Sequence, residues 1–553
     1  MFVRLHKQKQ RGKVYTSVHL CESYRDPAKG NAPRVRVLIN LGPLDKIGME
    51  ALRGLANSFA KAAGMPAVTE EAGGSLITAR DFGHVHAVCG VWDLLGLSRV
   101  LDRAGVNGEA TFSPVELIRM MVVNRICEPG SKLALLDWLD GVHYGDDKKP
   151  EYHHLLRAMD RLIDAKEKAE PLVAKALLPP DEPVELVFYD ITSTYFEGDR
   201  SLVDDDFRRY GYSRDGRFDK RQVVIGMVMT PSGIPLCHHV FPGNTVDKST
   251  VLEVVRDIKK RFPLKRVVFV GDRGMLSETN LDELFADDAL GYIVAHPLRR
   301  NRVARELIES LSPKVDRDSE SEQFLEDRGE TLRLVLAYSP KIAKVSRAGR
   351  KERLEKADTW IEEQVGKLTS PGGSRGRKPT AQGTYDRIRD YLRDHGLLGL
   401  YEVRKAGDGV EVGKNGQALQ WEDEIDGMLL VETTDADLAP KEVIARYKEL
   451  AEIERGWRSL KSTLLLRPVY HWTERRIRAH IFVCVLALQV ERWMRNRLQA
   501  QGVSVPKAID SLQRIKVGEI EIGGKRTRAV CRSTAEQKEI LAALGAPPVP
   551  ATL

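Results

Sequence analysis

The chain has 553 residues, too long for one ordinary hydrophobic core, so we expect three or more domains or large insertions. Hydrophobic residues make up 42% and charged residues 30% of the chain, which excludes a disordered or membrane-bound protein and favours a soluble globular one. Basic residues number 86 and acidic residues 79, and a net charge of +7 at this length does not by itself indicate a polyanionic partner.

Cysteine use and the apolar segments predict the compartment. The six cysteines are far apart and form no Cys-x-x-Cys pair, which favours a reducing cytoplasm and argues against a zinc site. The longest apolar stretch, Ile481–Val490, is too short to span a bilayer, and no apolar run follows the basic N-terminus. We therefore expect a cytoplasmic protein without a membrane partner.

The first 180 residues divide into two segments. Residues 1–60 form a predicted N-terminal β-rich subdomain with two short strands, Lys13–Leu20 and Arg34–Leu41. Residues 61–180 show helical spacing of apolar residues, and Ser113 followed by Pro114 is typical of a helix start. A proline-rich stretch near residue 180 is a plausible linker to the next segment.

Residues 181–297 have the pattern of an α/β core. Buried strands alternate with helices, and a Pro-Ser-Gly turn joins the second and third strands as a hairpin. In chain order the expected elements are strand Val184–Tyr189, strand Gln222–Thr230, strand Ile234–Phe241, helix Ser249–Phe262, strand Arg266–Val270, helix Ser277–Phe285 and strand Gly291–Ala295.

This core is interrupted and then resumes. Residues 298–425 mix short strands with highly charged helices, and such a long segment within an α/β core predicts an inserted domain. Residues 426–500 continue the core with a strand at Gly427–Glu432, a helix reaching about Leu464 and a last helix over Glu474–Leu498. Residues 501–553 are predicted to be a loosely built C-terminal tail.

Two predicted core strands end in an aspartate, at Asp190 and at Asp272. Ligands bind outside the carboxyl ends of parallel strands, so both carboxylates would face one cleft if these strands are neighbours. A buried carboxylate needs a partner, and a divalent cation is a common one. The alternative is that each aspartate caps the turn or helix that follows it.

A third carboxylate, Glu454, lies seven residues after Tyr447 and seven before Lys461. At 100° per residue, all three would lie on one stripe of a helix. A basic run follows, and the candidates for contact with a phosphate backbone are Tyr447, Arg458, Lys461, Arg467, Arg475 and Arg476. The alternative is an exposed, solvated helix face.

Together these motifs resemble the insertion-sequence-four superfamily of bacterial DDE transposases. That family has an aspartate after each of two strands and a helix with the pattern Tyr-x2-Arg-x3-Glu-x6-Lys. Tyr447, Glu454 and Lys461 match this pattern, whereas Leu450 stands where the family has arginine. Strings such as DITSTYFEG, GYSRDGRFDKRQVVIG and PGNTVDKST also resemble the family, over about residues 184–490.

The resemblance implies an α/β, RNase H-like core with a large insertion before the last catalytic helix. It implies that Asp190, Asp272 and Glu454 hold Mg²⁺, with Mn²⁺ as a substitute, for cleavage and strand transfer on double-stranded DNA. It further implies that the N-terminal region binds terminal inverted repeats and that a homodimer forms the synaptic complex. The alternatives are a structure-selective nuclease or resolvase on the same fold, and an inactive transposase-derived DNA-binding protein.

Other polar and aromatic residues have less specific interpretations. Cys237, His238 and His239 are predicted to pack in the core, because consecutive strand residues point to opposite faces. Glu197 and the acidic residues 204–206 are interpreted as solvated loop residues. Trp457 is expected to pack, and the role of Trp472 stays open between packing and stacking on a base.

Overall fold

The structure is a computed structural model. It describes residues 1–10, 13–26, 32–64, 75–109, 112–145, 149–179, 186–197, 206–246, 250–262, 267–272, 290–299, 302–329, 333–369, 379–522, 525–551 and 553. These residues form two compact units, the smaller made of Met1–Arg80, Lys516–Arg532 and Pro550–Leu553, the larger of Asp81–Ile515 and Ser533–Val549. Among the described helices, none combines the length and apolar content that a membrane span requires.

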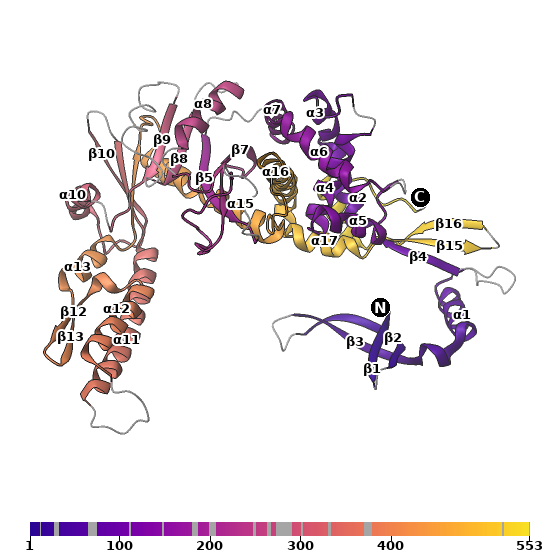
Figure 1. Ribbon diagram of the computed structural model, residues 1–553, viewed down its shortest axis with the longest axis horizontal. Helices are drawn as coiled ribbons and strands as arrows, with labels where there is room; N and C mark the ends of the chain where they lie inside the picture. The colour runs from indigo at the N-terminus through magenta and orange to yellow at the C-terminus, as the bar shows by residue number, and fades with distance from the viewer. Residues whose placement is uncertain are drawn as a thin grey trace. The chain divides into compact units, whose positions relative to one another are not determined.

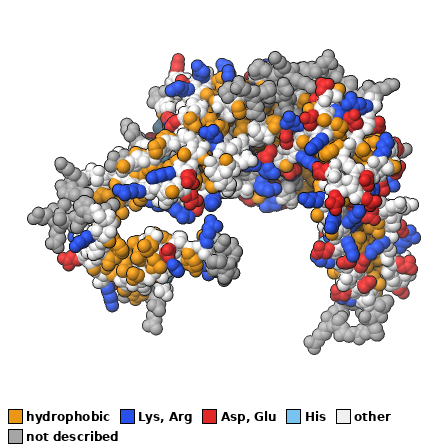
Figure 2. Space-filling view, turned by 180° about the vertical axis from the view of Figure 1, so that it is seen from behind, with side chains coloured by type: hydrophobic (Ala, Val, Ile, Leu, Met, Phe, Trp, Pro, Cys, Tyr) orange, Lys and Arg blue, Asp and Glu red, His pale blue; other side chains and the backbone are white. Residues whose placement is uncertain are grey.

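The smaller unit contains two sheets of three strands each, the first of them antiparallel. One consists of β1 (Phe2–Gln10), β2 (Lys13–Asp26) and β3 (Ala32–Pro43), followed by helix α1 (Leu44–Ala62). The other joins β4 (Ser75–Asp81) to β15 (Lys516–Ile522) and β16 (Lys525–Val530). Both strands predicted before residue 60 are confirmed. Apolar side chains gather on the surface of this unit (Figure 2), among them the exposed Val3, Leu5, Val14, Val37 and Ile39.

A helical layer opens the larger unit. Its helices are α2 (Gly83–Leu94), α3 (Leu97–Arg103), α4 (Pro114–Cys127), α5 (Lys132–Gly141), α6 (Tyr152–Asp164) and α7 (Lys166–Leu177). The predicted cap is confirmed, since the Ser113 side chain accepts a hydrogen bond from the Glu116 amide. The apolar helix α16 (Glu474–Leu498) packs against α4, α6 and strand β7, which explains why its middle residues are buried.

The central sheet has eight strands in the order β10-β11-β14-β9-β8-β5-β6-β7. Figure 1 labels β5, β7, β8, β9 and β10 of this sheet. β8 pairs in parallel with β5 and β9, and the other pairings are antiparallel. The strands are β5 (Leu186–Tyr195), β6 (Gln222–Met229), β7 (Pro235–Pro242), β8 (Val267–Asp272), β9 (Leu290–Ala295), β10 (Gln323–Arg328), β11 (Arg333–Tyr338) and β14 (Met428–Thr433). Helix α8 (Val251–Arg261) covers one face with Val254, Val255 and Ile258. The chain is thus mixed α/β with a large sheet, as predicted, and the expected helix Ser277–Phe285 lies outside the described residues.

The segment between β9 and β14 has two structural parts. After α10 (Arg302–Leu311), β10 and β11 extend the central sheet. All six residues of β11 are buried, and β11 pairs with β14 along its whole length. The other part has its own core around Ala357, Ile388 and Leu392. It comprises α11 (Pro340–Thr369), α12 (Ala381–Asp394), β12 (Tyr401–Ala406), β13 (Gly409–Lys414) and α13 (Gly416–Ile425), grouped together in Figure 1.

The residues after 500 differ from expectation. Helices α17 (Val505–Gln513) and α18 (Ala535–Leu544) bury Leu512 and Leu541, and β15 and β16 form a hairpin. The prediction of a loosely built C-terminal tail is therefore wrong for the described residues of this stretch. Each element is short, but its apolar residues pack against residues distant in the sequence.

Candidate active site

Asp190 and Asp272 lie on neighbouring parallel strands. Leu186, Val187 and Phe188 pair with residues 268, 269 and 270 of β8, so continuing this register sets the backbone of Asp190 beside that of Asp272. A Cβ atom on Gly271 would lie 3.6 Å from the Tyr189 carbonyl oxygen, which agrees with this register. The structure therefore places the two positions side by side, as expected for parallel neighbours.

The two strands do not end in the same way. β8 ends at Asp272 as predicted, but β5 continues through five more residues to Tyr195, so the prediction that this strand stops at Asp190 is wrong. The extension is held by β6, which pairs antiparallel with β5 from Phe188 to Tyr195. Asp190 lies where the pairing with β8 has ended while the pairing with β6 goes on. It is therefore at an opening in the sheet and not at the end of a strand.

The Asp190 carboxylate is partly buried against helix α15 (Ala451–Arg458). The Trp457 indole N–H donates a hydrogen bond of 3.1 Å to Asp190 Oδ2. Burial, with a smaller contribution from the negative charge of Glu454, raises the pKa of Asp190 to about 6. The Ile191 amide, Arg214 and Trp457 oppose this rise. Trp457 packs, as expected, and also has a polar role that the sequence analysis missed.

Helix α15 also carries Glu454, which lies near the Asp190 carboxylate. It lies three residues before Trp457, so both side chains are on one face of the helix. Glu454 is exposed, and its charge acts on the Asp190 carboxylate. The structure thus brings Glu454 toward Asp190, beside the backbone position of Asp272.

The single helix predicted to reach Leu464 is wrong. α14 (Pro440–Lys448) ends before α15 begins, and i+3 hydrogen bonds tighten the chain between them, such as Leu450 N–H to the Tyr447 carbonyl. α15 is followed by a π-helical turn, Ser459–Thr463. Tyr447, Glu454 and Lys461 therefore lie on three consecutive segments, and the geometry of a regular helix does not place them on one stripe.

A model of the DDE transposase domain family matches residues 185–490, more than half of the chain and the part that contains this arrangement. The chain belongs to this family. The N-terminal domain of IS1634 family transposases matches residues 3–70. No curated protein matches the chain. The protein is an insertion-sequence transposase, and its domains imply that it binds DNA.

Two candidate DNA contacts of the transposase share one acidic partner. Lys461 Nζ lies 3.1 Å from Asp215 Oδ1, and Arg467 Nη1 lies 3.0 Å from Asp215 Oδ2. The Arg467 guanidinium also lies over the Tyr195 ring at the end of β5, 4.6 Å from its centroid. Asp215 had no assigned role in the sequence analysis, although it lies within the family-like string GYSRDGRFDKRQVVIG.

The remaining candidate contacts lie apart from this pair. Arg475 forms an ion pair with Asp164, and Arg476 lies 3.6 Å from Asp160. Both aspartates lie on α6. Arg458 is exposed on α15, and Tyr447 is half-buried at the end of α14. These positions lie on several elements and do not form the one stripe that was expected.

The other uncertain residues have structural partners in the transposase. Asp206 forms a buried ion pair with Arg208, so its interpretation as a solvated loop residue is wrong, and the pairing also argues against a further metal-binding carboxylate there. Residues 204 and 205 lie outside the described residues. Arg208 also lies over the Trp472 ring at 4.6 Å, and Trp472 remains 42% exposed. Glu197 is exposed and lies 3.8 Å from Lys220.

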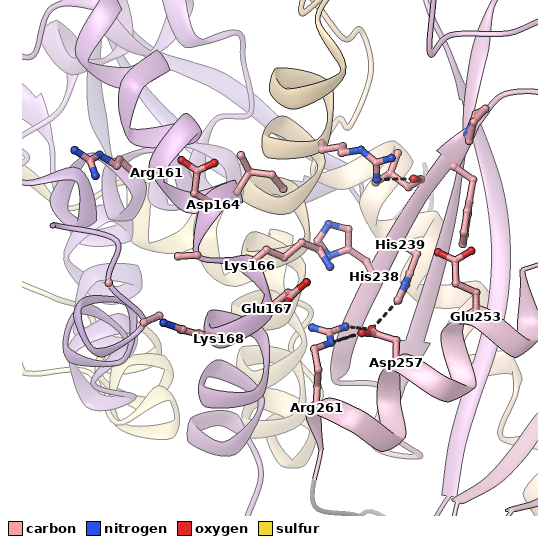
Figure 3. A pocket seen from close by; sticks show the side chains of 18 residues that line it. Arg161, Asp164, Lys166, Glu167, Lys168, His238, His239, Glu253, Asp257 and Arg261 are labelled. Atoms are coloured by element: carbon pink, nitrogen blue, oxygen red, sulfur yellow. Dashed lines mark hydrogen bonds and ion pairs between the residues drawn. The ribbon is translucent and has the colours of Figure 1, made fainter.

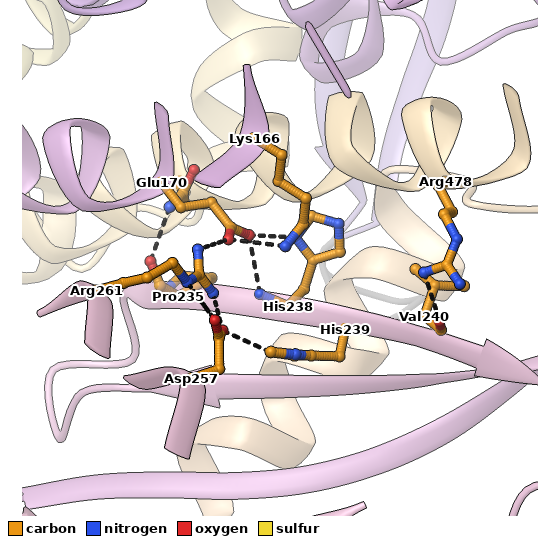
Figure 4. Close-up of polar contacts among 10 residues, drawn as sticks. Lys166, Glu170, Pro235, His238, His239, Val240, Asp257, Arg261 and Arg478 are labelled. Atoms are coloured by element: carbon orange, nitrogen blue, oxygen red, sulfur yellow. Dashed lines mark hydrogen bonds and ion pairs between the residues drawn. The ribbon is translucent and has the colours of Figure 1, made fainter. Parts of the chain in front are cut away.

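A second polar cluster lies on β7 and α8, at the edge of the sheet (Figure 4). Cys237, His239 and Asp257 each have a possible ligand atom within 4.8 Å of the others, and Figure 4 shows His239 and Asp257 of this cluster. However, the Asp257 carboxylate already accepts hydrogen bonds from Arg261 and pairs with His239. Cys237 is buried in the sheet core, in agreement with the packing prediction. This cluster is two strands away from β5 and does not coincide with Asp190.

His238 points to the other face of β7 and belongs to an ion-pair network around buried Glu170. Glu170 pairs with Lys166 at 2.8 Å, with His238 at 2.7 Å and with Arg261 (Figure 4). The charges of Lys166 and Arg261 and the contact with His238 hold the pKa of Glu170 well below its usual range despite burial. A cavity of about 960 Å³ opens beside this network and has both basic and acidic walls (Figure 3). The network joins α7, β7 and α8 and is structural.

Proposed function

We propose that this transposase binds the terminal inverted repeats of its insertion sequence and cuts and joins DNA at a site formed by Asp190, Asp272 and Glu454. The observation that carries the proposal is the register of β5 and β8, which sets two aspartate positions side by side. α15 adds a third carboxylate to the same place. Three acidic residues brought together from distant parts of the sequence are what a divalent-metal site requires.

The surroundings of Asp190 fit a metal ligand. Burial opposes its negative charge, and Glu454 adds a second negative charge nearby. Its described partners are the neutral donors Trp457 and Ile191, with Arg214 as the charged group that favours ionisation. A divalent cation held by Asp190, Asp272 and Glu454 would compensate for this unfavourable environment.

We propose Mg²⁺ as this cation, with Mn²⁺ as a substitute. Such ions, when bound, activate the attacking oxygen and stabilise the leaving oxygen of a phosphodiester. The protein's own side chains orient the metal-binding carboxylate and hold the DNA phosphates. The Trp457 indole fixes the Asp190 carboxylate, and Lys461 and Arg467 provide positive charge for the phosphates beside the scissile bond.

At the level of architecture we propose an RNase H-like core that is interrupted after β9 and completed by β14 and α15. In this interpretation the interrupting segment is 298–425, and the family subgroup is the insertion-sequence-four superfamily. Residues 1–60 and the helical region 61–180 would contact the inverted repeats, and a homodimer would hold two ends together. The exposed basic residues after Glu454 support DNA binding close to the site.

The test is a cleavage and strand-transfer assay on duplexes that carry the element's ends, with and without magnesium. We expect Asp190→Ala, Asp272→Ala and Glu454→Ala each to abolish cleavage while duplex affinity, measured without metal, stays within about twofold. Asp408→Ala, in an exposed turn of the β12–β13 hairpin, is the matched control and should cleave normally.

The same assay separates the alternatives. Cleavage without joining would favour a nuclease or resolvase, and end-binding without cleavage would favour an inactive derivative. Substantial cleavage by one of the three alanine variants would remove that residue from the site.

A further inference from the structure

Asp215 occupies an unusual position among the charged residues near the proposed active site. It lies in the stretch between β5 and β6, and this stretch is fastened to β5 by the Arg214 amide, which donates to Ser193 Oγ at 3.1 Å. From there its two carboxylate oxygens reach two different cations, Lys461 at 3.1 Å and Arg467 at 3.0 Å. One carboxylate therefore bridges two residues that we propose to contact DNA phosphates.

The bridge is partly withdrawn from water. The side chains of Lys461, Asp215 and Arg467 are 17%, 19% and 22% exposed. Burial lowers the pKa of Lys461, and the charges of Arg467 and Arg214 lower it further, while Asp215 opposes this shift. Two cations thus share one carboxylate, and the positive charge that Asp215 leaves uncompensated makes the pair Lys461–Arg467 attractive for a second anion.

This positive charge lies next to the carboxylates. Arg214 acts electrostatically both on Asp190 and on Lys461, so the two groups of residues share one neighbourhood. Tyr195, five residues beyond Asp190 on the same strand, supports the Arg467 guanidinium with its ring. An anion bound by Lys461 and Arg467 would therefore lie beside the proposed metal site.

We propose that Asp215 acts as an internal phosphate mimic, which occupies the cation pair Lys461–Arg467 in the DNA-free transposase and is displaced by a backbone phosphate of the bound duplex. This inference rests on the proposed function. A carboxylate and a phosphate both offer two oxygens to two cations, so the exchange keeps each cation paired in both states. The displacement subtracts from the affinity for any duplex, and only DNA with additional contacts compensates for it.

The test measures duplex affinity by fluorescence anisotropy over a salt series, in EDTA so that no cleavage is needed. The probes are a labelled end duplex and a labelled duplex of unrelated sequence. Asp215→Asn should bind the unrelated duplex roughly 5- to 10-fold more tightly, with a slope of log K against log salt steeper by about one. Asp215→Glu, which keeps the charge, should stay within about twofold of the parent chain.

Asp219→Asn is the matched control. It removes the same charge from the same stretch, but Asp219 pairs with Arg217 and not with the cation pair. It should change affinity by less than about twofold. The gain from Asp215→Asn should disappear in a Lys461→Ala/Arg467→Ala background, because the freed cations are then missing. Asp215→Ser replaces Asp215→Asn if thermal melting shows that the asparagine variant is unfolded.

The outcomes separate this inference from the proposed function. If the parent chain binds duplexes and Lys461→Ala weakens binding, but Asp215→Asn binds equally or more weakly, Asp215 positions the cations and the mimic is overturned. An equal gain from Asp219→Asn overturns it as well. If Lys461→Ala and Arg467→Ala leave affinity and salt slope unchanged, the proposed phosphate contacts themselves are wrong.

Discussion

Replacing Trp457 with phenylalanine tests how the proposed metal site is organised. The change removes one indole N–H, which donates to Asp190 Oδ2 at 3.1 Å, and keeps most of the ring in a site that is 6% exposed. A hydrogen bond to a charged acceptor contributes about 1.5–3 kcal/mol, and about 1.4 kcal/mol is tenfold in an equilibrium constant. We therefore expect the magnesium concentration for half-maximal cleavage to rise at least about tenfold.

The assay is a magnesium titration of single-turnover cleavage on an end duplex. The maximal rate at saturating magnesium should fall much less than the metal affinity, because Trp457 orients a ligand and is not one itself. Trp138→Phe is the matched control, since the Trp138 indole nitrogen is buried without a hydrogen-bond partner among the described residues. An unchanged half-saturating concentration in Trp457→Phe would refute the orienting role.

Two further predictions concern the other polar clusters. Glu170→Gln should lower the free energy of unfolding by about 3–5 kcal/mol, because it leaves buried positive partners uncompensated, whereas Glu167→Gln on the exposed face of α7 should change it little. Urea denaturation checks this, and equal stabilities would contradict it. Cys237→Ser should leave the magnesium dependence of cleavage unchanged, because Cys237 lies on β7, two strands from Asp190. A shifted magnesium titration would mean that the Cys237 cluster contributes to the metal requirement.

The sequence predicted the core strands well because these strands are continuous buried apolar runs. VELVFYD and RVVFVGD could be recognised as strands, but the sequence left open whether they are neighbours, and the structure shows their parallel pairing. The extension of β5 beyond Asp190 could not be predicted, since it depends on β6, which begins 27 residues after β5 ends. Which strand pairs with which is decided by the tertiary structure and not by the local sequence.

The sequence indicated Asp190, Asp272 and Glu454 as candidate carboxylates, whereas the expected placement of Tyr447, Glu454 and Lys461 on one helix stripe was wrong. Seven-residue spacing assumes one regular helix, and the break before α15 and the π-helical turn at Ser459–Thr463 remove that regularity. The sequence contains no clear signal for either break. Asp215 was missed because a carboxylate flanked by arginines in a polar stretch is typical of a solvated loop, and only the structure brings it to Lys461.

A buried lysine on α5, Lys132, gives the last prediction. Lys132 on α5 donates to His480 Nδ1 at 2.7 Å, and His480 Nε2 contacts the Leu466 carbonyl in the segment that follows α15. Burial, together with the charge of Arg125, lowers the pKa of Lys132 from 10.5 to about 7. That difference corresponds to on the order of 5 kcal/mol of unfavourable free energy while the amine stays protonated in the folded chain.

Because the folded pKa lies below the unfolded one, the unfolded chain holds an extra proton between about pH 7 and 10.5, and stability rises with pH across that window. We expect the free energy of unfolding of the parent chain to gain about 3 kcal/mol relative to Lys132→Met between pH 7 and 9.5. Urea denaturation at both pH values measures this gap, with Lys175→Met on the exposed side of α7 as the control. If Lys132→Met and the parent chain change equally with pH, Lys132 keeps its proton throughout, and its contact with His480 is an ordinary charged hydrogen bond.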